Sequence, residues 1–318
     1  MSDAHRLRAE AFTGRLQPWA RIPGCFGDSQ IVASSVDLDG RLIALIADAV
    51  AHATVDRPYR ARALVVGPSG VTADVELEPL DAEYPMIDAL GDGFVVADAR
   101  NRRQTAPRRH NVRVVGPDGS TVTSFNAGDA IEHLLVDRSG NIWTGYSDEG
   151  ELLIAGSSPR PLPGLGRWKP DGNLAWLPAY DGVGWMDCYA LNVGAKLTWG
   201  CPYTEFPLVT VDRKGVRSVR GTSVRGARGL LVAGPLVAFL GEYDDYRHDR
   251  RRTVPSRQVT VSIGWNDDGD GRVSVERKLP LTMPDGSAPP GQPRQIVCRD
   301  DRAFVRFDDP REWFLLEL

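Results

Sequence analysis

Short apolar runs separated by glycine-containing turns recur along the whole chain. The clearest example is the stretch Ile131 to Gly150, in which the apolar run Leu134 to Val136 is followed by the turn Asp137 to Gly140 and then by a second apolar run around Trp143. Aspartate favours such a turn through its side-chain acceptor, and glycine tolerates a positive φ. β-Branched and aromatic residues after the turn are typical of a strand. The stretch therefore predicts a β-hairpin.

Weaker copies of this hairpin follow one another, with turns of two kinds. The first kind resembles Asp137 to Gly140 and lies between two apolar runs. The second kind joins outer strands, and its successive glycines are separated by 49, 53, 43 and 56 residues, at positions 70, 119, 172, 215 and 271. A hairpin this short cannot bury its apolar face alone, so similar units must stack beside it. A period of about 50 residues with four short strands per unit is typical of propeller blades.

Six such units account for the chain. Five follow in order, at Ile31 to Leu77, Tyr84 to Phe125, Ile131 to Leu177, Trp185 to Val224, and Leu230 to Leu281. Only three strands remain after Arg294, whereas the segment Leu16 to Ile22 has no unit of its own. If that segment completes the last blade, the ring closes and its sheet edges are covered. We therefore expect an all-β fold: a six-bladed β-propeller of four-stranded antiparallel blades, closed by an N-terminal strand in the last blade.

The length of 318 residues is compatible with one domain, because closed all-β rings of this size are single domains. We expect a single β-propeller domain over residues 1–318, a disordered N-terminal segment over residues 1–14, and a monomer.

Composition and charge exclude several partner classes. The formal net charge of -4 provides no broad basic field for nucleic acid. No window approaches the roughly 18 continuous apolar residues of a membrane span, and the first 20 or so residues contain no apolar signal segment. We therefore expect a cytoplasmic protein that binds neither nucleic acid nor membrane.

Four cysteines, Cys25, Cys188, Cys201 and Cys298, lack the C-x-x-C spacing of a usual zinc site. Reduced thiols in packed positions are expected. A cross-strand disulfide between Cys188 and Cys201 is the alternative.

The best-patterned copy also resembles a known repeat. Its core follows the V-D-x-x-G-x-I-W-x-G pattern of regulator-type bacterial β-propellers, through Val136, Asp137, Gly140, Ile142, Trp143 and Gly145. The following stretch, Gly166 to Trp176, resembles the outer hairpin of actinobacterial propellers of unassigned function. This resemblance implies the fold, and it carries over no catalytic residue.

Propeller topology places the loops between blades and the loops between second and third strands around one channel mouth, where ligand sites form. Near the start of the inner strands, His133 and Asp187 are candidates for an acid–base pair or part of a metal site. The alternative is a buried pair that ties neighbouring blades together by hydrogen bonds.

The loops that leave the second strands carry acids in every unit: Asp48, Asp98, Asp148 with Glu149, Glu205, Glu242 and Asp308. If they converge, they form an electronegative rim suited to a divalent cation, a cationic small molecule or a basic peptide segment. Aspartate also caps turns at strand ends, which is the simpler interpretation. The cofactor therefore stays open, with a divalent cation as candidate. The expected binding residues are Glu132, Asp148, Glu149, Glu205, Glu242, Tyr243 and Gln295.

Two further stretches have features of binding loops. The charged loop Glu242 to Arg257 is either a lid or docking loop, or a solvated excursion. The run Asn266 to Gly271 imitates a calcium loop, but position twelve would be Arg277 rather than glutamate, so a hairpin turn explains it better.

Two functions remain. The first is a binding module that holds a small molecule or protein segment at the channel mouth. The second is a hydrolase or lyase at the same mouth, with His133 as base and an aspartate partner, with or without a metal. The absence of a complete catalytic motif favours the first.

Overall fold

The computed structural model describes residues 3–47, 57–101, 110–152, 160–161, 163–178, 183–243, 259–266 and 271–318. The described chain is all-β and divides into two compact units. The first unit comprises Ala20–Asp181 and Trp185–Cys188, and the second comprises Met1–Trp19, Gly182–Gly184 and Tyr189–Leu318. That all residues form one domain stays a prediction.

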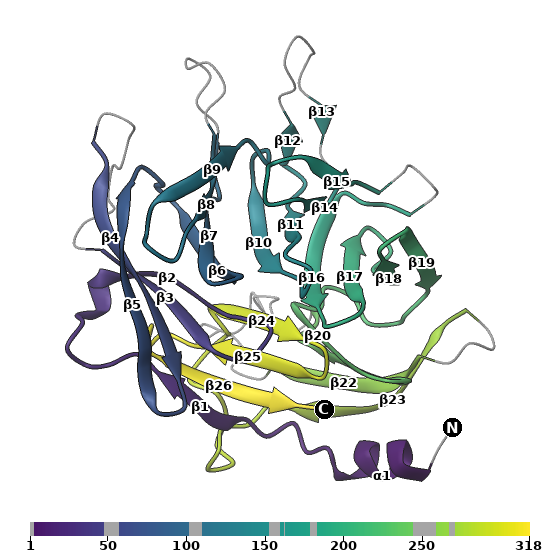
Figure 1. The fold of residues 1–318 in the computed structure, drawn as a ribbon. Coiled ribbons are helices and arrows are strands. Elements are labelled where there is room, and N and C mark those ends of the chain that lie inside the picture. The colour runs from purple at the N-terminus through teal and green to yellow at the C-terminus, as the bar shows by residue number, and fades with distance from the viewer. Residues whose placement is uncertain are drawn as a thin grey trace, which may run out of the picture. The chain divides into compact units, whose positions relative to one another are not determined.

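The first unit contains three four-stranded antiparallel sheets in which consecutive strands are neighbours, as in propeller blades (Figure 1). They are built by β2 (Ile31–Val36), β3 (Leu42–Ala47), β4 (Tyr59–Gly67) and β5 (Gly70–Leu80); by β6 (Pro85–Leu90), β7 (Gly93–Asp98), β8 (Val112–Val115) and β9 (Thr121–Phe125); and by β10 (Ile131–Val136), β11 (Ile142–Tyr146), β14 (Leu165–Trp168) and β15 (Leu174–Trp176). A two-stranded pair, β12 (Glu151–Leu152) and β13 (Arg160–Pro161), interrupts the third sheet in sequence.

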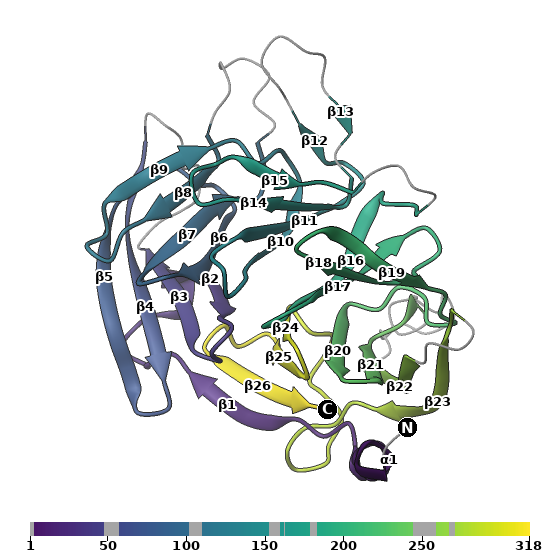
Figure 2. The ribbon, with the colours of Figure 1, turned by 45° about the vertical axis from the view of Figure 1, so that its right-hand side comes forward.

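The second unit contains another four-stranded sheet and part of an eight-stranded one (Figure 2). The first is β20 (Gly229–Ala233), β21 (Leu236–Leu240), β22 (Thr260–Asn266) and β23 (Val273–Pro280). The second has the order β1-β26-β25-β24-β16-β17-β18-β19. Its strands are β1 (Gln17–Arg21), β16 (Asp187–Val193), β17 (Thr198–Tyr203), β18 (Leu208–Asp212), β19 (Gly215–Arg220), β24 (Gln295–Arg299), β25 (Arg302–Arg306) and β26 (Glu312–Glu317).

One parallel pairing joins the two halves of the eight-stranded sheet. Asn192 on β16 lies opposite Cys298 on β24. The buried Asn192 amide donates to the carbonyls of Leu230 and Asp300, each at 2.7 Å, and accepts from the Asp300 N–H at 2.8 Å. Each of these bonds satisfies a polar group that would otherwise be costly to bury. The expected separate four-stranded groups are therefore merged here into one mixed sheet.

Residues 3–14 include a helix, and the expected disorder over residues 1–14 stays a prediction. Helix α1 spans Asp3–Ala11, and the side chains of Ala9 and Phe12 are buried. The Arg277 guanidinium donates to the Ala9 carbonyl at 2.7 Å, and Arg8 pairs with Asp301 at 2.6 Å. Arginine at a helix C-terminus satisfies carbonyls that have no partner within the helix.

Turn chemistry explains the repeated hairpins. The Asp137 carboxylate accepts the N–H groups of Ser139 at 2.8 Å and Asn141 at 3.0 Å, and the Trp143 indole at 3.0 Å. In the first sheet, Asp37 accepts the two equivalent backbone N–H groups, of residues 39 and 41. The patterned residues therefore form the framework of the hairpin.

Burial follows strand position. Strands β3 and β21 are buried along their whole length and read as continuous apolar runs, whereas the outer strand β23 alternates between less and more exposed residues. This alternation places its side chains on opposite faces of the sheet. None of the four cysteines forms a disulfide, including Cys188 and Cys201, and Cys25 is exposed rather than packed. No helix among the described residues is long and apolar enough to cross a membrane.

Candidate functional site

His133 contacts the backbone next to Asp187. Its ring lies beside Gly145, where an added Cβ would be 2.7 Å from the His133 Cδ2, so a larger residue there would displace the imidazole. The His133 Nε2 lies 3.0 Å from the carbonyl oxygen of Cys188, a geometry in which an Nε2–H donates. A base at this nitrogen would have to give up that bond. The contact supports the alternative in which His133 links strands β10 and β16 by a hydrogen bond. Catalysis by His133 and Asp187 stays a prediction.

Asp98 does not belong to an exposed acidic rim. Its side chain is buried, and its carboxylate accepts the N–H groups of Glu83 at 3.2 Å and Tyr84 at 3.0 Å. The carboxylate therefore caps the segment between β5 and β6, as the turn-capping interpretation expects. This corrects its placement among ligand-facing acids.

Most of the remaining predicted acids have a basic partner. The pairs are Glu149–Arg100 at 2.9 Å, Glu205–Arg225 at 3.2 Å, Glu242–Lys278 at 2.8 Å and Asp308–Arg294 at 2.6 Å. Glu132 and Asp148 are exposed, whereas Asp48 lies outside the described residues. Such pairing offsets the field that would attract a cation. Within the described ranges, no group of three or more histidines, cysteines or acids is arranged to hold a metal ion.

Gln295 has a partner within its own sheet. Its side-chain oxygen accepts two contacts from the Arg306 guanidinium, each at 3.4 Å. Burial of the guanidinium lowers the pKa of Arg306, and the nearby positive charge of Arg294 lowers it further. The predicted role of Gln295 in binding stays a prediction. Most of the charged loop and the interior of the calcium-like run lie outside the described residues.

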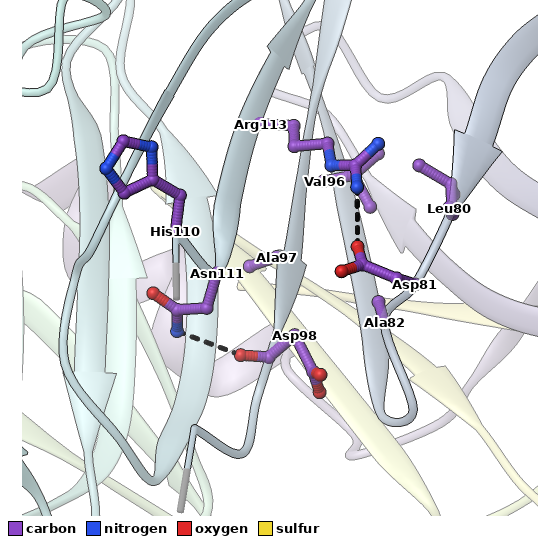
Figure 3. Close-up of a pocket in the computed structure, with 9 residues that line it drawn as sticks. All are labelled: Leu80, Asp81, Ala82, Val96, Ala97, Asp98, His110, Asn111 and Arg113. Carbon is purple, nitrogen blue, oxygen red and sulfur yellow. Dashed lines mark hydrogen bonds and ion pairs between the residues drawn. The ribbon is translucent and has the colours of Figure 1, made fainter. Parts of the chain in front are cut away.

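A hollow of about 230 Å³, open solvent included, lies between the end of β5 and strands β7 and β8 (Figure 3). Arg113 pairs with Asp81 at 2.5 Å, and the Asn111 amide donates to the Asp98 carbonyl at 3.0 Å. Asn111 also bonds Gly128 and Ala127. The polar side chains that line the hollow therefore already have partners within the chain, so we assign it no ligand.

The second unit carries a cluster that the sequence analysis identified only in part. We call it the aromatic–arginine cluster, and its members are Tyr189, Tyr203, Glu205, Phe206, Arg225, Arg228 and Tyr243. They come from β16, from the end of β17 and the loop after it, from the segment before β20, and from the residues after β21.

Four rings form the centre of the aromatic–arginine cluster. Tyr189 and Tyr203 stack with centroids 6.1 Å apart, and Phe206 meets Tyr189 edge to face at 5.0 Å. Tyr243 meets Phe206 at 5.2 Å, and its hydroxyl donates to that of Tyr189 at 3.1 Å. These separations lie in the range of favourable aromatic pairs. Phe206 is buried, whereas all three tyrosines are half-buried and present part of their surface to water.

The two arginines pack on these rings. The Arg228 guanidinium lies 5.4 Å from the Tyr189 ring centre, and that of Arg225 lies 6.0 Å from the Phe206 ring centre. Both arginines are exposed, and both distances allow a cation–π attraction. The cluster thus combines flat apolar surface with guanidinium groups.

Local backbone geometry holds the cluster in place. Gly226 has φ +72, and an added Cβ would lie 2.7 Å from the Tyr243 Cε1 and still closer to Cδ1. The N–H of Tyr243 donates to the Arg225 carbonyl at 2.9 Å, which fixes the ring over this glycine. Phe206 itself has φ +54, an uncommon conformation for a bulky residue. Strained residues of this kind concentrate at functional sites.

The predicted residues Glu205 and Tyr243 belong to the cluster, and Glu242 adjoins it. Tyr189, Tyr203, Phe206, Arg225 and Arg228 were missed. Tyr189 lies two positions after Asp187 on the same strand, a spacing that places both side chains on one face. A search along that face would have found it, whereas the other residues converge only through tertiary structure.

No family model matches the chain, and no curated protein matches it. Similar solved structures include the β-propeller domain of Myceliophteria thermophila Cps50 (Swd1), with 9% identity, coverage of 91% of this chain and 97% of that chain, and a TM-score of 0.42. Citrobacter koseri AztD has 12% identity, coverage of 90% and 71%, and a TM-score of 0.46. The computationally designed Ika8 protein has 10% identity, coverage of 95% and 100%, and a TM-score of 0.43.

Strand pairing defines an all-β chain with several four-stranded antiparallel sheets, of the kind found in propeller blades, and one mixed eight-stranded sheet. At these identities and TM-scores, the neighbours carry no argument about function.

Proposed function

We propose that this protein is a non-catalytic binding protein with the fold of a six-bladed β-propeller, and that the aromatic–arginine cluster is its ligand site. The blade count rests on the four four-stranded sheets and on the eight-stranded sheet, which counts as two blades if β1 completes the last one. Ligand sites of rigid β-scaffolds form on the loops that join their strands. Most members of the cluster lie on or beside such loops.

The observation that carries the proposal is the set of three half-exposed tyrosines around one buried phenylalanine, with two exposed arginines on the rings. Tyrosine and arginine are enriched among the residues that dominate binding energy. Tyrosine offers a large rigid surface with few rotatable bonds. Little side-chain entropy of the protein is therefore lost when a ligand orders it. A cluster that served only packing would bury these rings.

Thermal-shift screening of the full chain tests the proposal. Panels of anionic, neutral and cationic small molecules and short peptides are compared on the native protein and on Tyr203→Ala and Arg225→Ala. A ligand at about 100 times its Kd stabilises the native state by about 2.7 kcal/mol. We expect at least one compound class to raise the melting temperature of the native protein, and both variants to reduce that shift.

Arg217→Ala is the matched control, because Arg217 is an exposed arginine on β19 outside the cluster. It should leave the shift unchanged. Binders whose shift is insensitive to both cluster variants would contradict the location of the site, and a full screen without any shift would contradict the binding function.

A further inference from the structure

Arg225 has an exchangeable acidic partner. Its Nη1 lies 3.2 Å from the Glu205 carboxylate and 3.5 Å from the Thr204 carbonyl oxygen. The Arg225 side chain is 48% exposed and that of Glu205 is 79% exposed. Exposed ion pairs of this kind contribute about 0–1 kcal/mol. A second carboxylate can therefore replace Glu205 at little cost.

The guanidinium geometry favours a carboxylate over other anchors. Arginine presents parallel N–H groups that match the two oxygens of a carboxylate, and a bidentate pair is stronger than a single contact. Glu205 reaches Arg225 through one oxygen only, Oε2. A ligand carboxylate that bonds two guanidinium N–H groups would thus improve on the internal partner.

The neighbouring acid Glu242 has partners of its own. It is bonded to Lys278 at 2.8 Å and to the Ser262 hydroxyl, so its charge is offset.

Arg225 packs on Phe206, and two tyrosines that contact Phe206 set the shape of the rest of the ligand. Tyr203 and Tyr189 are inclined by only 27° to each other, and both keep part of their surface in water. A flat aromatic ring can stack on such surface or meet it edge to face, with a gain of about 0.5–1.5 kcal/mol beyond burial. A saturated ring lacks this contribution.

We infer that the aromatic–arginine cluster binds small aromatic carboxylates, and that Glu205 occupies the carboxylate position until the ligand displaces it. The inference rests on the proposed function, because it names the ligand class of the same site. Arg225 is the anchor, Tyr203 and Tyr189 are the stacking surface, and Glu205 is an internal competitor.

Calorimetric titration of the full chain with 2-naphthoate, its neutral analogue 2-naphthamide and cyclohexanecarboxylate tests the inference. A charge-assisted hydrogen bond contributes about 1.5–3 kcal/mol, which corresponds to about 10- to 100-fold in affinity. We expect 2-naphthoate to bind at least about 10-fold more tightly than the amide and more tightly than the saturated acid.

The variants separate competition from a merely structural role. Glu205→Gln removes the competing charge and should increase the affinity for 2-naphthoate about 3- to 5-fold, which corresponds to the loss of one weak exposed ion pair. The affinity for 2-naphthamide should stay unchanged. Arg225→Ala should weaken the binding of 2-naphthoate at least about 10-fold. Arg225→Lys should have an affinity between those of the native protein and Arg225→Ala, because lysine keeps the charge but cannot form a bidentate pair with a carboxylate. Arg217→Ala should have no effect. Circular dichroism confirms folding of each variant.

Three outcomes overturn the inference: no saturable binding of 2-naphthoate up to about 10 mM, equal or tighter binding of the amide, or weaker binding of 2-naphthoate by Glu205→Gln. If a neutral or cationic compound binds and Tyr203→Ala abolishes that binding, the inference fails and the proposed function stands. If Tyr203→Ala and Arg225→Ala both bind 2-naphthoate as tightly as the native protein does, the proposed location of the site fails as well.

Discussion

Gly226→Ala perturbs the aromatic–arginine cluster without replacing any ring or charge in it. Gly226 lies between Arg225 and Arg228, and its backbone has φ +72. The added methyl carbon would lie 2.7 Å from the Tyr243 Cε1 and nearer still to Cδ1, so the Tyr243 ring must move. Displacement of that ring breaks the 3.1 Å hydroxyl bond to Tyr189 and the edge-to-face contact with Phe206 at 5.2 Å.

The expected cost has two parts. The left-handed backbone costs a residue with a Cβ about 1–2 kcal/mol. Displacement of Tyr243 adds about 1–3 kcal/mol, from one lost hydrogen bond and weakened aromatic pairs. Gly91→Ala is the control for the first part, because Gly91 has φ +60 and an added Cβ would meet nothing within 4 Å.

Denaturant unfolding and the 2-naphthoate titration are measured on both variants. Gly226→Ala should lose more unfolding free energy than Gly91→Ala by about 1–3 kcal/mol, and it alone should bind 2-naphthoate more weakly. Equal destabilisation by both substitutions, or unchanged binding by Gly226→Ala, would refute the role assigned to Tyr243.

Three further predictions concern the framework. Asp137→Ala removes the acceptor of two turn N–H groups and the Trp143 indole, so the free energy of unfolding should fall by about 1–3 kcal/mol; an unchanged denaturation midpoint would contradict the turn assignment. Tyr146→Phe should cost a similar amount, about 1–3 kcal/mol, because the buried hydroxyl donates to the Ala127 carbonyl at 2.6 Å; a neutral effect in the same assay would exclude this role. Burial raises the pKa of the Cys201 thiol to about 12, so at pH 8 or so a thiol reagent should modify Cys25 rapidly and the buried cysteines only after unfolding; rapid native-state labelling of Cys25→Ser would contradict this.

The hairpins were predictable because their determinants are local. The turn at Asp137 is closed by bonds to residues two, four and six positions later, and the first two of these bonds recur at Asp37. The second strands β3 and β21 read as apolar runs because they are buried along their length. Strand order within each four-stranded group therefore followed from the sequence.

Features that depend on distant residues were not predictable in this way. The parallel pairing of Asn192 with Cys298 joins residues far apart in the chain, and nothing local distinguishes Asn192 from a turn residue. Helix α1 buries only Ala9 within its bounds, whereas Leu7 is 64% exposed, so no apolar stripe marks the helix in the sequence.

The candidate site shows the same division. Acids at strand ends were easy to find, yet their type does not distinguish Asp98, which caps a buried segment, from Glu205, which reaches solvent. The rings of the aromatic–arginine cluster come from β16, from the end of β17 and the loop after it, and from the residues after β21. Only their packing identifies Arg225 as a neighbour of Phe206.

Fluorine NMR of the full chain labelled with 3-fluorotyrosine is the most direct test of the ligand site. Single Tyr→Phe variants assign the resonances of the eight tyrosines. On titration with 2-naphthoate, the signals of Tyr189, Tyr203 and Tyr243 should shift together and saturate, while those of Tyr59 and Tyr146 stay in place. Saturable shifts confined to tyrosines outside the cluster would contradict the proposed site.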